Sequence, residues 1–227
     1  MSNPSHILVI RLSAMGDVAM TVPVLRAFTK LYPDVKLTVL TRELFNPLFR
    51  DLDNVHVYPA HVNDNHKGVS GLYKLSREIK LLKCDAIADL HNVLRSKVLK
   101  IMLGIPKVFS IDKGRYEKKG LIKGNDFKQL KSTHQRYADV FNSLGYPIDL
   151  SNPTFPKPAT LNDNCLKLVG TPNKKRIGIA PFAAYEGKMY PLEQMGQVIK
   201  KLSQTHQVLL FGGGKKEIQL LNYFFCR

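Results

Sequence analysis

An aspartate lies at a turn where a nucleotide-binding protein usually carries glycines. Residues 7–12, ILVIRL, form an apolar run, and the segment SAMGDVAMTVP follows at residues 13–23. A dinucleotide-binding turn requires the pattern GxGxxG, whereas this turn contains only Gly16, followed directly by Asp17. A carboxylate at the start of a helix would also repel the phosphate that normally binds there. We therefore do not expect NAD to bind at this turn.

Two roles fit Asp17. As a carboxylate in the first turn of a helix it would complement the helix dipole, which contributes about 0.3–1 kcal/mol. Alternatively, it would project into a cleft between domains and act as a general base that accepts a proton from a hydroxyl group. The residue types alone leave both roles open.

Other candidate groups give weaker signals. The segment FGGGKKE at residues 211–217 fails the Walker pattern, because no Ser or Thr follows the lysine and the glycine spacing is wrong. His91 and His134 lack partners at metal-ligand spacing, so we expect satisfied or solvated side chains. The three cysteines show no CxxC spacing. The sequence therefore predicts no metal site and no disulfide framework, and favours a reduced intracellular compartment.

Strand-like and helical patterns alternate regularly around these residues. Strands are expected at residues 7–12, 36–41, 55–59, 85–90 and 107–111. Helices are expected at residues 17–31, 43–51, 70–82, 93–103 and 130–144. This alternation predicts an α/β fold, in which a parallel sheet has helices on both faces. Such sheets bind ligands at the carboxyl ends of their strands.

A proline-rich segment separates two parts of unequal size. We expect a complete Rossmann-like domain at residues 1–150, a linker at 151–175 with a short helix near 161–169, and a second domain at 176–227. The second part offers strands at 175–182 and 207–212 and helices at 191–204 and 215–225. Two strands and two helices cannot cover both faces of a parallel sheet. We therefore expect an incomplete second domain in a C-terminally truncated chain.

The chain is strongly basic, with a formal net charge of +16 over 227 residues. Residues 97–136 hold eleven Lys or Arg against three acidic residues. Such a patch fits nucleic acid, an acidic membrane surface, a phosphorylated substrate or simply a solvated surface. Few aromatic residues and no nucleic-acid motif accompany it, which disfavours nucleic acid. Neither a signal peptide nor an apolar run of about 18 residues is present, so we expect a cytosolic protein.

Four segments in order resemble glycosyltransferase family 9, the ADP-heptose:lipopolysaccharide heptosyltransferases. They are ILVIRLSAMGDVAMTVPVLRAF (7–28), DLHNVLRSK (89–97), THQRYADVFNSLGY (133–146) and IGIAPFAAYEGKMYPLEQMGQVIKKL (177–202). The resemblance implies two Rossmann-like domains, the GT-B architecture. It also implies an inverting transfer, without a metal ion or another cofactor, from a nucleotide-diphosphate sugar such as ADP-heptose to the lipid A core oligosaccharide.

The resemblance also assigns roles to residues of the first domain. Asp17 corresponds to the family's general base, and Ser13 and Gly16 would shape the turn beside the acceptor. Arg95 and Arg136 would face the anionic acceptor, although exposed helix charge explains either arginine equally well. The acceptor is lipid-linked, which implies a cytoplasmic protein bound peripherally to the inner leaflet of the inner membrane.

In the second domain the resemblance implies donor contacts from Lys188, Ala184 and Gly212. Lys188 would contact the donor diphosphate, where a cation is needed because no metal is present; one exposed lysine among many is the plain alternative. Ala183 and Ala184 stand where many members carry hydroxyl groups, and Tyr190 replaces a common tryptophan.

A later family segment resembling DSGxxHLA, which holds the nucleotide sugar, does not occur before Arg227. We therefore expect the 227-residue chain to be poorly active. The alternative function is a basic module that binds nucleic acid or docks on an anionic membrane without catalysis.

Overall fold

The computed structural model describes residues 3–124, 127–156, 158–170, 174–183 and 185–225. The chain divides into two compact units, Met1–Lys157 and Pro158–Arg227. The division falls inside the segment that the prolines mark as a linker. The two units are described separately below.

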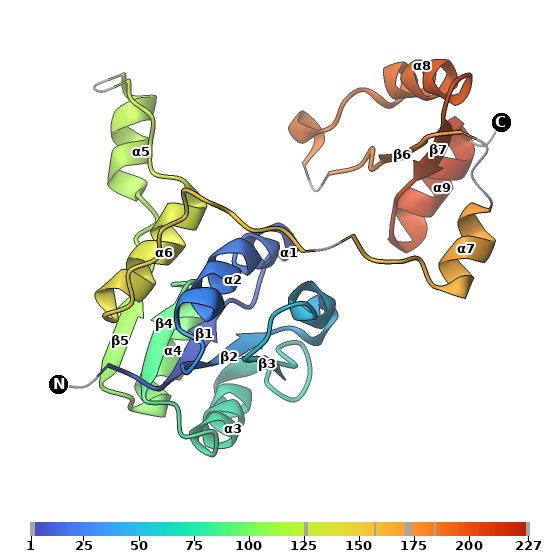
Figure 1. Ribbon diagram of the computed structural model, residues 1–227. Helices are drawn as coiled ribbons and strands as arrows, with labels where there is room; N and C mark the ends of the chain where they lie inside the picture. The colour runs from blue at the N-terminus through green and yellow to red at the C-terminus, as the bar shows by residue number, and fades with distance from the viewer. Residues whose placement is uncertain (1–2, 125–126, 157, 171–173, 184, 226–227) are drawn as a thin grey trace. The chain divides into compact units, whose positions relative to one another are not determined.

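The first unit is built on a five-stranded parallel sheet (Figure 1). Its strands are β1 (His6–Ile10), β2 (Lys36–Thr41), β3 (Val55–Pro59), β4 (Ala86–Asp89) and β5 (Lys107–Ser110). The spatial order is β3-β2-β1-β4-β5, so the chain reverses its direction of winding between β1 and β4. Ile10 pairs with Leu40 on one side and Asp89 on the other, which brings the carboxyl ends of three strands level.

Helices cover both faces of this sheet because side chains in a strand alternate between faces. Ile7 and Val9 belong to one buried cluster, together with residues of α2 (Val22–Leu31) and α6 (Thr133–Ser143). Leu8 and Ile10 belong to the other, with residues of α3 (Gly68–Lys80) and α4 (Leu94–Leu103). Phe28 of α2 is fully buried, and we estimate that replacing it with Ala costs about 3–5 kcal/mol.

Two expected elements differ in detail, and one helix is new. The helix expected at 17–31 is two helices, α1 (Met15–Ala19) and α2, because Pro23 lies at the start of α2 and has no N–H to bond back into α1. Residues Glu43–Phe49 form the 3-10 helix η1, which contains Pro47. Within the basic segment, α5 (Arg115–Ile122) was not expected at all.

The second unit pairs β6 (Arg176–Ile179) with β7 (Gln207–Leu210) in parallel. Its helices are α7 (Asp163–Val169), α8 (Leu192–Ser203) and α9 (Gly214–Phe225), with the short 3-10 turn η2 (Glu186–Lys188). No residue of either strand is fully buried. The sheet of this unit therefore has little core of its own over the described residues. None of the helices described in the chain is both long and apolar enough to cross a lipid bilayer.

Candidate active site

The turn after β1 holds Asp17 by an ion pair with Arg11. One guanidinium nitrogen of Arg11, Nη2, contacts Oδ2 of Asp17, and the other, Nη1, donates to the carbonyl oxygen of Leu90 at 2.7 Å. The Arg11 side chain is 8% exposed, whereas that of Asp17 is 48% exposed. A buried cation thus fixes the orientation of a carboxylate that remains accessible to a ligand.

The backbone around Asp17 is tied to the rest of the unit. The Ala14 N–H donates to the Asp17 carboxylate at 3.5 Å, and the Tyr137 hydroxyl donates to the Asp17 carbonyl oxygen at 3.2 Å. The Ser13–Ala14 peptide bond is cis. A methyl group added at Gly16 would meet no atom within 4 Å, so the turn leaves open space beside Asp17.

The loop after β4 is held by a buried carboxylate, Asp89. Its Oδ1 accepts the N–H groups of His91 and Asn92 at 3.0 and 2.8 Å. Its Oδ2 accepts from the Ser96 hydroxyl at 3.0 Å and pairs with Lys100 Nζ at 2.6 Å. Four donors on one fully buried carboxylate fix the conformation of this loop.

His91 connects the two loops. Its Nε2 lies 3.3 Å from the Ser13 hydroxyl, while its buried Nδ1 has no hydrogen-bond partner. Burial, and next the positive charge of Arg11, lower the pKa of His91 to about 4 against the opposing effects of Asp89 and Asp17. The imidazole is therefore neutral at pH 7, and His91 is not the satisfied or solvated histidine that the sequence suggested.

Lys113 follows β5 and lies at the same carboxyl-terminal edge of the sheet as the loops after β1 and β4. Its Nζ donates to the carbonyl oxygen of Asn92 at 3.1 Å. Burial lowers the pKa of Lys113, and Arg11 and Arg115 lower it further. The carboxyl ends of β1, β4 and β5 thus all contribute polar groups, in the region where parallel sheets bind ligands.

A basic pocket of about 640 Å3 opens beside these loops. It lies over the end of β5 and the start of α4 and α5, and its basic side chains are Lys97, Lys113 and Arg115. A half-exposed carboxylate near a basic pocket can accept a proton from the hydroxyl group of an anionic ligand.

The two arginines predicted to bind the acceptor differ in exposure. Arg95 is exposed in the first turn of α4. Arg136 is only 6% exposed, so the interpretation as exposed helix charge is wrong for this residue. Its Nη2 lies 2.5 Å from Glu117 Oε2 and its Nη1 donates to the Asp112 carbonyl oxygen at 3.3 Å. Acceptor binding by Arg95 and Arg136 stays a prediction.

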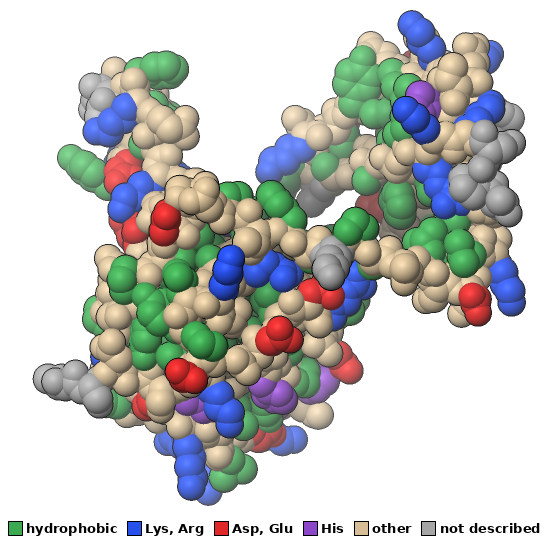
Figure 2. Space-filling view, in the orientation of Figure 1, with side chains coloured by type: hydrophobic (Ala, Val, Ile, Leu, Met, Phe, Trp, Pro, Cys, Tyr) green, Lys and Arg blue, Asp and Glu red, His purple; other side chains and the backbone are tan. Residues whose placement is uncertain are grey.

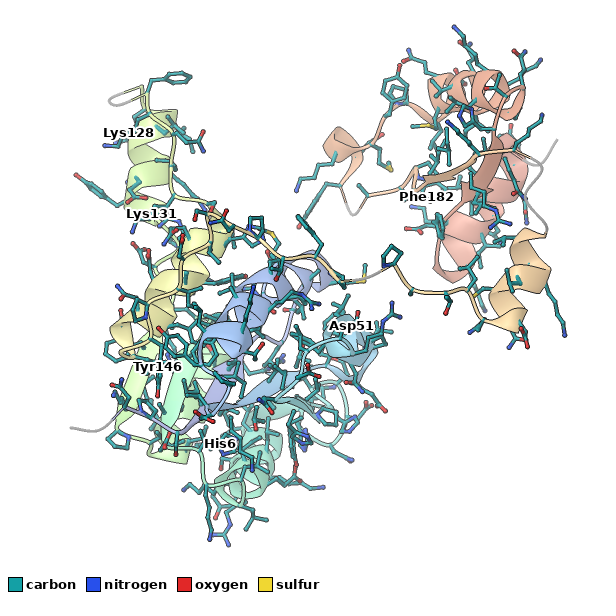
Figure 3. The ribbon with its side chains drawn as sticks, in the orientation of Figure 1. His6, Asp51, Lys128, Lys131, Tyr146 and Phe182 are labelled. Atoms are coloured by element: carbon teal, nitrogen blue, oxygen red, sulfur yellow. The ribbon has the colours of Figure 1, made fainter. Side chains whose placement is uncertain are left out.

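Two predicted donor residues follow the strands of the second unit. Lys188 follows β6 at the end of η2, exposed, with Nζ 5.4 Å from the Tyr185 ring centroid. Gly212 follows β7, where an added methyl would lie 2.9 Å from a Leu221 carbon and 3.2 Å from a carbon of Phe182, the residue labelled in Figure 3. Close packing alone thus explains this glycine. Ala184 lies outside the described residues.

Sequence reasoning missed Arg11, Asp89 and Lys113 and gave His91 no role. All four lie at or just beyond the end of an expected apolar strand, and that position was the available signal. Among the described residues, no group of three His, Cys, Asp or Glu side chains is placed to hold a metal ion.

Comparison with known proteins identifies the family of this chain. The sequence profile of glycosyltransferase family 9 (heptosyltransferase) matches residues 72–222. Lipooligosaccharide heptosyltransferase 2 of Campylobacter jejuni is 23% identical over 213 residues, which cover 93% of this chain and 61% of that protein. The chain therefore spans less than two thirds of this relative's length.

Solved structures of heptosyltransferase type share the fold. A family 9 glycosyl transferase from Veillonella parvula has a TM-score of 0.76 and 21% identity, over 97% of this chain and 67% of that one. The E. coli ADP-heptose lipopolysaccharide heptosyltransferase II has a TM-score of 0.64 and 21% identity, over 96% and 67% respectively. The expected α/β fold of GT-B type is confirmed. The chain belongs to glycosyltransferase family 9.

Proposed function

We propose that this protein acts in the transfer of a heptose-like sugar from a nucleotide-diphosphate sugar to the inner core of lipopolysaccharide. The donor is ADP-heptose or another nucleotide sugar, and the acceptor is the lipid A core oligosaccharide. Family membership and the heptosyltransferase names of its relatives support the reaction type. The observation that carries the proposal is the accessible Asp17 carboxylate, held by buried Arg11 at the ligand-binding edge of a parallel sheet.

The proposed step is a single displacement with inversion. The acceptor hydroxyl oxygen attacks the anomeric carbon and forms the new glycosidic bond, while the bond from that carbon to the diphosphate oxygen breaks. The acceptor proton passes to Asp17, and the nucleoside diphosphate leaves with the electron pair. Neutral His91 holds the Ser13 side of the turn in place. Ser13 and Gly16 shape the turn and leave room for the acceptor sugar.

Acceptor binding is assigned to the basic pocket beside this turn. Lys97, Lys113 and Arg115 offer positive charge to the phosphates or carboxylates of the core oligosaccharide. Arg95, exposed on α4, adds a further contact. Arg136 acts through Glu117, whose side chain it holds at the start of α5.

Donor binding is assigned to the second unit. Lys188 neutralises the departing diphosphate, a role that requires a cation when no metal ion takes part. Gly212 and Ala184 allow the donor to approach the backbone. Because the chain spans 61% of the length of the C. jejuni relative, we expect transfer by the 227 residues alone to be impaired.

We further propose that the protein works in the cytoplasm, bound peripherally to the inner leaflet of the inner membrane. Its partners are the nucleotide sugar and the lipid-linked acceptor, and nucleic acid is not one of them. The positive charge of the chain supports attraction to an anionic lipid surface.

The test is a transfer assay with ADP-heptose and a purified core acceptor, with product detected by mass spectrometry over long incubations. Asp17→Asn keeps the shape of the side chain and removes its basicity. We expect product formation to fall about 100-fold or more relative to the unmodified chain. Asp34→Asn, at an exposed position on the same unit, is the matched control and should leave the rate unchanged.

Equal rates for Asp17→Asn and Asp34→Asn would exclude Asp17 as the base. Normal turnover by the unmodified 227 residues, at the rate of a full-length relative, would contradict the impairment but would leave the role of Asp17 intact.

A further inference from the structure

Helix α5 differs from the other helices of the first unit because it packs no side chain into the core. It spans Arg115–Ile122 and contains no buried residue. Figure 1 shows it extending away from the sheet of its unit. Tyr116 is 91% exposed, Ile122 is 85% exposed, and Phe127, just beyond the helix, is 97% exposed. Large apolar side chains that are so exposed on one projecting segment mark a contact surface.

The base of α5 is held firmly. Glu117 forms its ion pair with Arg136 of α6 at 2.5 Å. Gly114 begins the helix at φ +59°, and a methyl group added there would lie 2.2 Å from the same guanidinium. The close approach of Gly114 to Arg136 and the ion pair together fix the direction in which the helix projects.

One face of α5 remains free of the rest of the unit. Glu117 turns one side of the helix toward α6, and residues three, four and seven positions apart share a face of a helix. Arg115, Lys119 and Ile122 have this spacing and lie opposite Glu117. The free face therefore combines two cations with an exposed aliphatic side chain.

A pocket of about 440 Å3 lies beside the helix. It is lined by Tyr116, Glu117, Lys119 and Gly120 of α5, by Lys123, and by Lys128 and Leu130 of the segment that returns to α6. Figure 3 shows Lys128 beside α5, and Lys131 lower on the returning segment. In Figure 2 the same projection carries blue and green side chains together. Three lysines around one pocket fit an anionic head group.

We propose that α5 and residues 127–131, together called the α5 docking surface, bind an anionic phospholipid bilayer. Residues 113–131 hold seven basic and two acidic residues, and one of the two, Glu117, is already paired with Arg136. The lysines contact lipid phosphates, while Ile122 and Phe127 enter the boundary between head groups and acyl chains. The inference rests on the membrane association in the proposed function and identifies the element responsible.

Lipid fits this surface better than nucleic acid does. Ile122 is aliphatic and offers no stacking face for a base, yet it is almost fully exposed. An amphipathic basic helix with exposed apolar side chains is typical of binding to a membrane interface.

The location of the surface also suits a lipid-linked acceptor. Tyr116 lines both the lysine pocket beside α5 and the basic pocket near Asp17. The eight residues of α5 measure about 12 Å along the helix axis. If the far end of α5 contacts the bilayer, the basic pocket lies about the length of this helix from the head groups. A sugar chain anchored in the bilayer could then reach the pocket.

The test is vesicle flotation with the full 227-residue chain. One set of vesicles is pure phosphatidylcholine and the other contains phosphatidylglycerol. We expect binding only to the anionic vesicles, falling steeply with salt. Lys119→Glu/Lys123→Glu should weaken the binding by at least about tenfold. Ile122→Ser/Phe127→Ser should weaken the binding to a similar extent, and the binding that remains should still fall with salt.

Matched variants on α3 control for charge and for exposed apolar area. Lys74→Glu/Lys80→Glu changes the net charge equally, and Val69→Ser/Leu81→Ser removes similarly exposed apolar side chains. Both should bind anionic vesicles as the unmodified chain does. Circular dichroism checks that every variant is folded.

The outcomes separate the two proposals. The α5 docking surface would be overturned if both α5 variants bound anionic vesicles as well as the unmodified chain, or if the α3 variants lost as much binding as the α5 variants. Either result would leave membrane association itself intact. No binding to either vesicle would contradict membrane association as well. Tight binding of RNA without binding to vesicles would show that the surface serves nucleic acid instead. The transfer assay on Asp17→Asn is independent of all three.

Discussion

At the scale of single residues, the site depends on how charge and burial are divided between neighbours. Arg11 is buried and Asp17 is half exposed, so the cation is held by the protein while the carboxylate faces solvent. His91 is kept neutral because it is buried among positive charges. Protonation of His91 would add a positive charge near Arg11 and Lys113, both of which disfavour it.

This arrangement predicts a loss of stability in acid. Burial lowers the pKa of His91 from 6.5 to about 4. Between these values the unfolded chain binds a proton that the folded chain does not, so the free energy of unfolding falls as the pH falls from 6.5 to 4. We expect a contribution of about 1–3 kcal/mol from this residue.

His91→Gln isolates the effect, because glutamine is polar but does not titrate. Urea unfolding of both proteins at pH 7 and pH 4.5 should show a smaller loss for the variant. Identical losses would mean that His91 does not cause the acid sensitivity.

At the scale of elements, one carboxylate joins β4 to α4. Asp89 ends β4 and accepts from Ser96 and Lys100 of α4 as well as from the loop between them. Lys100 Nζ also donates to the Ser110 hydroxyl of β5 at 2.6 Å. The helix, the loop and two strands therefore share one polar network around the buried Asp89 carboxylate, which positions His91.

Asp89→Asn should be strongly destabilising. It removes the charge that Lys100 pairs with and leaves that ammonium, whose side chain is 15% exposed, without its anionic partner. We expect a loss of about 3 kcal/mol in the free energy of unfolding, measured by urea titration with circular dichroism. Asp53→Asn, at an exposed position, is the control and should change stability by less than about 0.5 kcal/mol. A small effect at Asp89 would show that the network is dispensable.

The strands were predictable from sequence and the arrangement of the site was not. The ends of β2 and β3 agree with expectation. Helix α5 was missed because it is short, rich in charged residues and buries nothing. Asp17 was singled out from its own segment, but its partner Arg11 was missed. The contact between the first loop and His91 depends on the β1–β4 pairing, which no local pattern reveals.

At the scale of the whole molecule, the two units differ in how much core they have. The buried apolar clusters draw all their fully buried members from the first unit. Both strands of the second unit are at most partly buried over their described length. The first unit thus has the means to remain folded when the second does not.

Limited chymotrypsin digestion of the intact chain tests this difference. Phe155 is 83% exposed beside the boundary between the units, so we expect early cleavage there. The N-terminal fragment should persist and keep a cooperative thermal transition, while the C-terminal part is degraded. Early loss of the N-terminal fragment, detected by mass spectrometry, would contradict the prediction.

The pairing of Ile10 with Asp89 limits how related sequences can vary in length. Inserting one residue into β1 or β4 would shift its loop by about 3.3 Å and turn its side chains to the opposite face. Ser13 and His91 would then no longer be in contact. Helix α5 has no such constraint, because it buries nothing. We therefore expect insertions and deletions to be tolerated better beyond Glu117 of α5, because its ion pair with Arg136 fixes only the base of the helix, than in the strands beside Asp17.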